Sequence, residues 1–369
     1  MGDVMTGRGI DQILPNPCPP ELHERWIGSA EDYVRLAERA NGPIPRRAGF
    51  DYPWGEALPA WREVTPDLAI ANLETAVTRS DAWLDKGINY RMSPENVGCL
   101  EAAGFDACAL ANNHVLDWGR QGLVDTLEAL ARAGIGTAGA GADRAAARAP
   151  AILAAKAGPR VLLVSCVVAD SGVPQSWAAR EHRSGVNLVT LADQTVDAIA
   201  RDLAAVRRPA DIAVVSIHWG SNWGYGIEPA QRSFAQNLIR RAGVSIVHGH
   251  SSHHPKGVEV FDARLILYGC GDLLNDYEGI SGYAAYRGDL VAAYLAEVCA
   301  ADGRLAALRI LPFRVRRLRL ERPSESDVNW LAARLNREGA ELGTRFAASG
   351  SKALYLERDQ RQAAPNHRM

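Results

Sequence analysis

The chain of 369 residues is 47% hydrophobic and 23% charged, which is the composition of a globular protein with room for one large α/β domain or two smaller ones. Its net charge of −2 provides no broad basic surface, so we expect neither nucleic acid nor a membrane as the main partner. No apolar stretch approaches the ~20 residues that cross a bilayer, and we find no secretory signal, which together predict a cytoplasmic protein.

Short apolar segments alternate with segments of helical spacing through most of the chain. After a first strand that is very short or incomplete, strands are expected at 67–73, 107–111, 160–168, 212–217, 244–247, 258–261 and 265–268. Helices are expected at 30–40, 58–63, 93–103, 122–133, 190–207 and 229–242. A β-hairpin over 290–320 and a helix over 329–346 follow, with a polar tail after Arg358. This pattern predicts an α/β domain over 1–320 and a C-terminal helix and tail over 321–369.

Histidines are concentrated in one short segment, 246–257, which reads I-V-H-G-H-S-S-H-H-P-K-G. Apolar residues precede and follow this segment, which predicts a strand, an irregular turn that carries the imidazoles, and a second strand. A neutral imidazole nitrogen serves both as a metal ligand and as a base. The segment is therefore a candidate for metal binding or proton transfer.

Polar side chains follow the ends of several expected strands. They are Asp3, Glu74, Asn113 with His114, His218, and the turn that contains His250 and His253. Ligands bind at the carboxyl ends of strands in α/β sheets because the loops converge there. A mixture of oxygen and nitrogen donors suits Mn²⁺, Zn²⁺ or Fe²⁺, or Ca²⁺ or Mg²⁺ if oxygen and water dominate.

The order of the motifs resembles the CapA family of capsule and poly-γ-glutamate biosynthesis proteins. The matching residues are Gly2-Asp3, Asn72-Leu73-Glu74, Asn112–Gly119, His218-Trp219-Gly220 and Gly249–His253. This family is similar to calcineurin-like metallophosphoesterases, which implies an α/β fold, a four-layer α/β/β/α sandwich with two mixed sheets.

The resemblance also implies roles for individual residues. Asp3, Glu74, Asn113, His218 and His250 would hold one or two divalent metal ions. His114 would be the general acid/base, oriented by Asp117, and His253 would be a further ligand or base. The D-x-H that opens metallophosphoesterases is incomplete here, because Val4 and Met5 follow Asp3, and serines interrupt the final histidine pair. A single ion is therefore an alternative to a pair.

Three functions are compatible with these residues and this resemblance. We expect first a peptide epimerase, because the chain looks like the branch of the CapA family that includes lasso-peptide epimerases. His114 with Asp117, and His253 with Asp3 or Asp11, would move the α-proton. Trp219 and Trp223 could hold an apolar peptide end.

The second function is metal-dependent hydrolysis of a phosphoester, for which Arg8 and Arg91 are isolated candidates to bind the phosphoryl group. The third is a role in the assembly of a capsule polymer, as the family name suggests. The sequence leaves the oligomeric state open.

Overall fold

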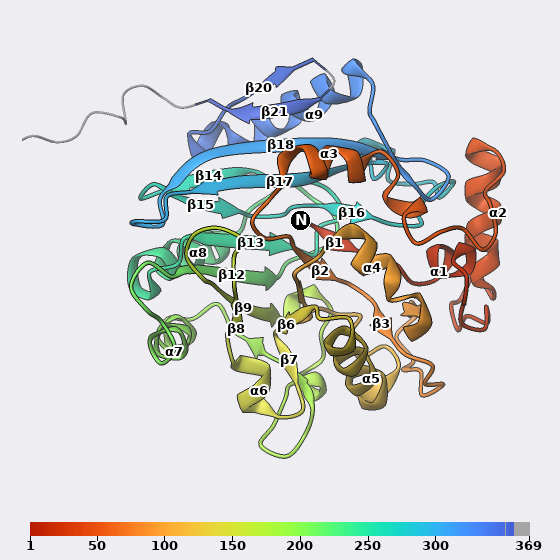
Figure 1. Cartoon of the computed structure of the whole chain (residues 1–369), viewed down its shortest axis with the longest axis horizontal. Helices are drawn as coiled ribbons and strands as arrows, with labels where there is room; N and C mark the ends of the chain where they lie inside the picture. The colour runs from red at the N-terminus through yellow and green to blue at the C-terminus, as the bar shows by residue number, and fades with distance from the viewer. Residues whose placement is uncertain (351, 358–369) are drawn as a thin grey trace, which may run out of the picture.

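The computed structural model describes residues 1–350 and 352–357, and two facing β-sheets form its centre (Figure 1). The first sheet is parallel throughout, in the order β16 (Asp272–Leu274), β1 (Asp3–Val4), β2 (Ile70–Leu73), β5 (Ala107–Ala109) and β6 (Gly136–Ala138). The second has the order β11 (Leu188–Val189), β9 (Val161–Val168), β12 (Ile212–His218), β13 (Ile246–His250), β15 (Arg264–Leu267) and β14 (Val258–Phe261). In it β14 and the extra strand β8 (Ala151–Leu153) are antiparallel to their neighbours.

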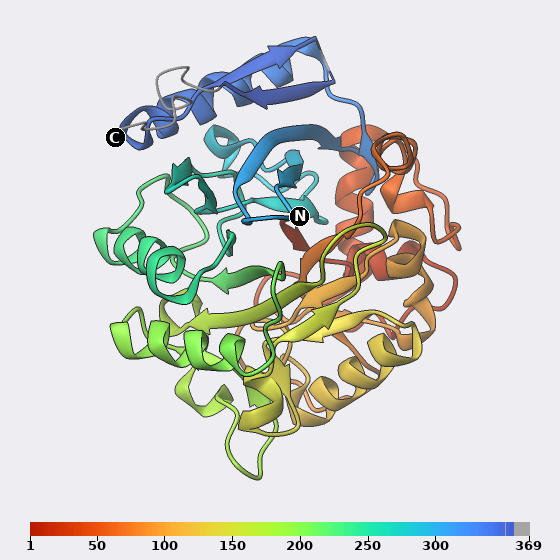
Figure 2. The ribbon, with the colours of Figure 1, turned by 60° about the vertical axis from the view of Figure 1, so that its left-hand side comes forward.

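Helices cover the outer faces of both sheets, which gives the expected four-layer α/β sandwich (Figures 1 and 2). On the first sheet lie α3 (Ala57–Val64), α4 (Gly98–Ala103) and α5 (Gly119–Arg132), and on the second α7 (Asp193–Ala204) and α8 (Pro229–Ala242). A small apolar core that includes Ala107, Ala138, Leu163 and Val214 joins the inner faces. The expectation of two mixed sheets holds for the second sheet only.

A third sheet crosses the domain boundary that we expected at residue 320. Its strands are antiparallel, in the order β17 (Leu290–Val298), β18 (Leu305–Val315), β21 (Ala353–Leu356) and β20 (Phe346–Ser349), with β19 (Leu320–Glu321) beside β18. The hairpin expected over 290–320 corresponds to β17 and β18. The expected helix over 329–346 is α9 (Glu325–Gly339), which ends earlier because Phe346 already belongs to a strand. The polar tail that we expected after Arg358 lies outside the described residues.

Several smaller elements complete the structure. They are α1 (Gly9–Ile13), α2 (Ala30–Asn41), α6 (Arg144–Arg148), the strand pair β3 (Ala76–Val77) and β4 (Arg91–Met92), and the pair β7 (Ala140–Gly141) and β10 (Gly185–Val186). Within the described part of the chain, no helix combines the length and the apolar composition that crossing a bilayer requires.

The histidine-rich segment folds differently from the expectation. His248 and His250 lie within β13 itself, and only His253 and His254 lie on the loop after it. The parallel pairing of β13 with β12 continues to the last residue of both strands, which places His250 opposite His218. The backbone pairing therefore holds these two imidazoles in register.

Candidate metal centre

The two large sheets bring their functional residues together through strand register. On the first sheet, Asp3 of β1 lies between Asn72 of β2 and Asp272 of β16, its direct partners in the parallel pairing. On the second sheet, His218 and His250 are direct partners. All five residues are buried. The loop that follows β13 joins the two sets, because the backbone N–H of Ser251 donates to Asp3 Oδ2 at 3.2 Å.

Asp3, His218 and His250 form the first group of potential ligands. Each offers one atom, and these atoms lie within 4.8 Å of one another. The two histidine Nδ1 atoms are 2.8 Å apart, and Asp3 Oδ1 is 3.7 Å from His250 Nδ1. The other nitrogen of His250 is 2.8 Å from Ser216 Oγ, which fixes the orientation of the ring. Such a partner behind a ligating histidine is common in metal sites.

Asp3, His253 and Asp272 form a second group that meets the same distance limit. His253 Nδ1 is 2.9 Å from Asp272 Oδ1, and Asn275 Nδ2 donates to the other oxygen of Asp272 at 2.8 Å. Asp3 thus belongs to both groups. A carboxylate shared between two neighbouring sets of ligands is the arrangement that a bridged pair of metal ions requires.

Buried acids make this region favourable for cations. Burial and the neighbouring Asp272 raise the pKa of Asp3 to about 7. Burial, followed by the charges of Asp3 and Asp272, raises the pKa of Glu74 well above its usual value. Carboxylates that repel one another in a buried site are stabilised in their charged form by a cation.

The histidines differ in their electrostatics. Burial keeps the pKa values of His218 and His250 well below the usual value, so that both rings are neutral and can donate a lone pair to a metal. Burial opposes protonation of His253 as well, but Asp272 and Asp3 raise its pKa. The first group is therefore the more suitable one for metal binding through neutral imidazoles, and the second resembles a histidine–aspartate pair.

His114 and Asp117 form a second histidine–aspartate pair beside the two groups. His114 Nδ1 lies 2.7 Å from Asp117 Oδ2, and its Nε2 lies 3.8 Å from Glu74 Oε1. The backbone N–H of Tyr90 also donates to Asp117, at 2.7 Å. Burial lowers the pKa of His114 to about 4, against the charge of Asp117. A neutral His114 held by its Nδ1 can accept a proton at Nε2.

Two unpartnered polar atoms indicate that the residues fit a metal ion. His218 Nε2 and Asn113 Oδ1 are both buried and have no hydrogen-bond partner within residues 1–350 and 352–357. Buried polar atoms nearly always have partners in native proteins, so each needs an explanation. An ion held between the two Nδ1 atoms does not reach His218 Nε2, because the nitrogens of one imidazole ring point in different directions, so a second ion or a bound substrate would supply this partner. Imidazole nitrogens together with carboxylate oxygens suit Zn²⁺, Mn²⁺ or Fe²⁺ better than Ca²⁺ or Mg²⁺.

The two arginines that we expected to bind substrate, Arg8 and Arg91, form ion pairs with acidic residues of the chain. Arg8 Nη2 lies 2.5 Å from Asp276 Oδ1, and its guanidinium group stacks 4.3 Å from the centre of the Tyr90 ring. Arg91 lies 3.0 Å from Asp81 and stacks 3.8 Å from the centre of the Trp118 ring.

Three further residues were expected at the site, namely Asp11, Trp219 and Trp223, and only Trp223 lies beside it. Asp11 accepts hydrogen bonds from the backbone of Cys18 and Ser93, and its place beside His253 is taken by Asp272. The Trp219 side chain is buried and donates to the carbonyl of Tyr268. The Trp223 ring centre lies 5.4 Å from that of His253, so this tryptophan does border the centre.

Several residues of the centre were not among our candidates. Asp272 follows the strand expected over 265–268 but was not chosen as a candidate, and in the structure it begins β16. Asn72 was noted only as part of a motif, although it donates to both Asp3 and Glu74. Lys86 comes from a loop without any regular pattern, and its Nζ donates to Asp117 Oδ1 at 2.7 Å. The pairing of β16 with β1 is the signal that identifies Asp272.

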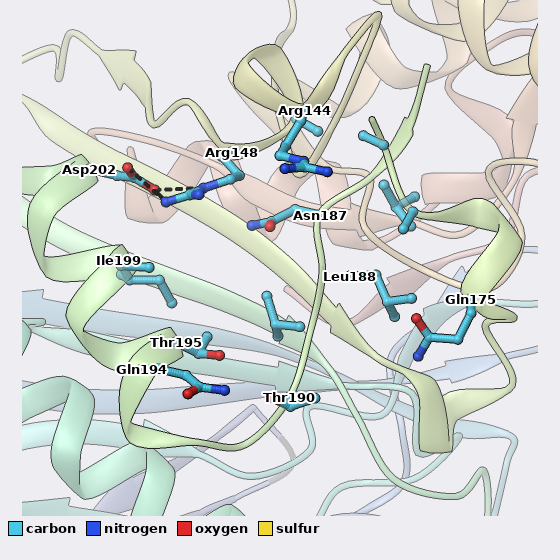
Figure 3. Close-up of a pocket in the computed structure, with 16 residues that line it drawn as sticks. Arg144, Arg148, Gln175, Asn187, Leu188, Thr190, Gln194, Thr195, Ile199 and Asp202 are labelled. Atoms are coloured by element: carbon cyan, nitrogen blue, oxygen red, sulfur yellow. Dashed lines mark hydrogen bonds and ion pairs between the residues drawn. The ribbon is translucent and has the colours of Figure 1, made fainter. Parts of the chain in front are cut away.

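A separate cavity of about 390 Å³ lies between α6, α7 and the segment before β11 (Figure 3). Arg148 and Asp202 form an ion pair on its wall, and Gln175, Gln194 and Thr195 add further polar groups. None of the potential metal ligands described above lines this cavity.

The fold and the buried cluster together define the class of protein. It is an α/β sandwich of the calcineurin-like type, in which strands of both sheets contribute histidines and carboxylates to one site. Residues 1–277 match a family model that is described as "Bacterial capsule synthesis protein PGA_cap". The chain belongs to this family.

Known relatives agree with this assignment. A probable polyglutamine synthesis accessory protein of Mycobacterium tuberculosis is 49% identical over 356 residues, which cover 96% of this chain and 93% of that protein. The PGA biosynthesis protein CapA of Bacillus subtilis is 27% identical over 278 residues, covering 75% and 62%. The capsule biosynthesis protein CapA of Bacillus anthracis is 27% identical over 241 residues, covering 63% and 56%.

Proposed function

We propose that the protein is a metal-dependent hydrolase that acts on a glutamate polymer as an accessory to its synthesis. The sharing of Asp3 by two groups of ligands, beside a neutral histidine, is the observation that supports a hydrolytic centre. The names of the relatives, which concern polyglutamine, PGA and capsule synthesis, support a polymer over a lasso peptide. The bond cleaved would be an amide between glutamyl residues.

Each residue has a role in this proposal. Asp3, His218 and His250 would hold one divalent ion, and Asp3, His253 and Asp272 would hold a second. A bound ion of this kind lowers the pKa of a water molecule and polarises a carbonyl group. His114 accepts the proton of the attacking water at Nε2 and returns it to the departing amine. Asp117 orients the His114 ring and stabilises the imidazolium that forms.

The cationic side chains near the centre favour amide hydrolysis over phosphoester hydrolysis, because they are already paired with acidic residues of the chain. Phosphoryl transfer relies on arginine or lysine groups that clamp the phosphate oxygens. Arg8 is bonded to Asp276, and Lys86 to Asp117. These side chains are therefore occupied within the protein.

The test combines metal analysis with a cleavage assay. The purified protein is analysed for bound metal and incubated with poly-γ-glutamate, with and without a chelator, and new amine ends are counted. We expect cleavage that stops on chelation and returns with added Mn²⁺ or Zn²⁺. A phosphodiester in a parallel reaction should stay intact, and its cleavage in place of the polymer would overturn the assignment.

A second candidate function, epimerisation of a peptide, is favoured by one observation. Two histidine–aspartate pairs, His114 with Asp117 and His253 with Asp272, both border the ligand groups. One pair could remove an α-proton and the other could return one to the opposite face. The same incubation in D₂O separates the candidates, because epimerisation incorporates deuterium at an α-carbon without producing new amine ends.

A further inference from the structure

Three arginines that the metal centre does not use come together near the start of α5. Arg120 lies in the first turn of this helix, and Arg180 and Arg183 lie in the segment between β9 and β10, which projects at the lower edge of the molecule (Figures 1 and 2). The backbones of Arg180 and Arg183 are bonded to each other in both directions, at 2.9 and 3.2 Å. Their side chains therefore leave from one tight turn.

A direct bond attaches Arg120 to this segment. Its Nη2 donates to the carbonyl oxygen of Ser176 at 2.7 Å. Burial, and after it the charges of Arg183 and Arg180, lower the pKa of the Arg120 guanidinium. The three positive charges are thus close enough to repel one another. The first turn of a helix is also the positive end of its dipole, where a cation is unfavourable.

The guanidinium groups lack acidic partners. Arg120 Nη1 and the Nε and Nη2 atoms of Arg183 are buried without a hydrogen-bond partner in the described part of the chain, and none of the three arginines has an ion pair there. Glu181, the acid of the same turn, lies 3.9 Å from His182 instead. Buried N–H groups of a guanidinium without acceptors cost stability, so stability of the protein alone does not account for this arrangement.

A short chain of contacts links the three arginines to the metal centre. The residue after Ser176 is Trp177, and Lys86 Nζ lies 5.3 Å from the centre of its ring. Lys86 in turn donates to Asp117, the partner of His114. The position of Gly172, earlier in the same segment, lies beside the Asn113 side chain. The segment from 172 to 183 therefore runs from the edge of the centre to the arginines.

We propose that Arg120, Arg180 and Arg183 form a carboxylate-binding site that holds side chains of a glutamate polymer beside the metal centre. The proposal rests on the function proposed above. A guanidinium fork matches a carboxylate in two parallel hydrogen bonds, which a lysine cannot offer. Two forks from one turn and a third from the start of α5 suit several carboxylates at short spacing, as along an acidic chain, and the unpaired N–H groups of Arg120 and Arg183 would gain acceptors on binding.

A binding assay with a matched control tests this site. A labelled oligomer of γ-linked glutamate is titrated with the full chain and followed by fluorescence anisotropy. The Arg120→Gln/Arg183→Gln double variant should bind at least about tenfold more weakly, since charge-assisted hydrogen bonds are among the strong ones. Arg132→Gln removes one positive charge from the last turn of the same helix, as each substitution of the double variant does at its own position, and should bind like the wild type.

Thermal melting and metal content complete the test. The double variant should keep its metal content and melt near the temperature of the wild type, because the loss of the Arg120 bond to Ser176 is offset by the loss of repelling, unpaired groups. The oligomer should raise the melting temperature of the wild type only. Equal affinity of the double variant, or an equal loss in Arg132→Gln, would overturn the proposal. So would displacement of the oligomer by inorganic phosphate at the same concentration, which would indicate a phosphate site.

The outcomes separate this site from the proposed hydrolysis. Arginine-dependent binding of an oligomer that is never cleaved supports the site and contradicts the hydrolase. Cleavage and binding that are unchanged in the double variant support the hydrolase and contradict the site.

Discussion

At the scale of single residues, two aspartates show how the environment decides the role of a carboxyl group. Asp117 orients His114, whereas Asp11 fastens the backbone around Cys18 and Ser93. Both are fully buried, and the sequence alone suggested a catalytic role for both. Their hydrogen-bond partners now lead to different expectations.

Replacing His114 by alanine should lower the rate of hydrolysis by about 10²- to 10⁴-fold, because a positioned general base contributes this much. Metal content and melting temperature should change little, since none of the three residues of either ligand group is altered. Asp117→Asn should give a smaller loss. His23→Ala, which removes an exposed histidine, is the control. A His114→Ala variant with full activity would exclude the role given to this ring.

Asp11 should influence stability as a function of pH. Burial raises its pKa to about 6, whereas an unfolded chain keeps it near 3.8. The folded protein therefore holds the proton more tightly, and its stability should fall as the pH rises from about 4 to 6, by at most about 3 kcal/mol. Asp11→Asn should remove this part of the pH dependence. Urea unfolding at several pH values measures it, and an unchanged slope in the variant would contradict the assignment.

At the scale of elements, local signals predicted some boundaries well and others poorly. The expected helix over 229–242 matches α8, because Pro229 occupies its first position, Gln231 accepts from the backbone of Glu228, and Gly243 with φ of 62° ends it. The last expected helix was too long, because nothing local shows that Phe346 pairs with Leu356 in a sheet. Long-range pairing also explains why Asp272 was missed.

The parallel pairing of β13 with β15 depends on a glycine between the histidines of β13. A Cβ atom at Gly249 would lie 2.5 Å from the carbonyl oxygen of Leu267 and 2.7 Å from that of Tyr268. Gly249→Ala should force β13 away from β15, destabilise the fold by about 1–3 kcal/mol and weaken metal binding. Gly28→Ala, where a Cβ meets nothing within 4 Å, is the matched control. Denaturant unfolding and metal titration of both variants give the comparison.

At the scale of the whole molecule, the metal centre joins the two large sheets. β1 and β16 contribute Asp3 and Asp272 from the first sheet, and β12 and β13 contribute His218 and His250 from the second. An ion held by Asp3, His218 and His250 would connect the two sheets directly. The family resemblance in the sequence predicted Asp3, Glu74, Asn113, His218 and His250 as ligands of one centre. It could not predict the register that adds Asp272, and Glu74 and Asn113 belong to neither ligand group.

Removing the metal should therefore lower the stability of the entire fold. A ligand present at 100 times its Kd stabilises the folded state by about 2.7 kcal/mol, so a chelator should lower the melting temperature by several degrees. Adding back Zn²⁺ or Mn²⁺ should restore it. The Asp3→Asn variant should melt at one temperature with and without chelator. A wild type that is equally indifferent to the chelator would argue against a resident ion.

The helix α9 covers apolar residues of the second sheet, and this has a practical consequence. Val328, Leu331 and Leu335 pack against Val258, Leu265 and Leu267, yet α9 lies beyond residue 277, where the family match ends. A recombinant fragment that ends at residue 277 would expose the apolar side chains of Val258, Leu265 and Leu267 to solvent. We expect such a fragment to aggregate in inclusion bodies, whereas a chain expressed through residue 357 keeps these side chains buried under α9.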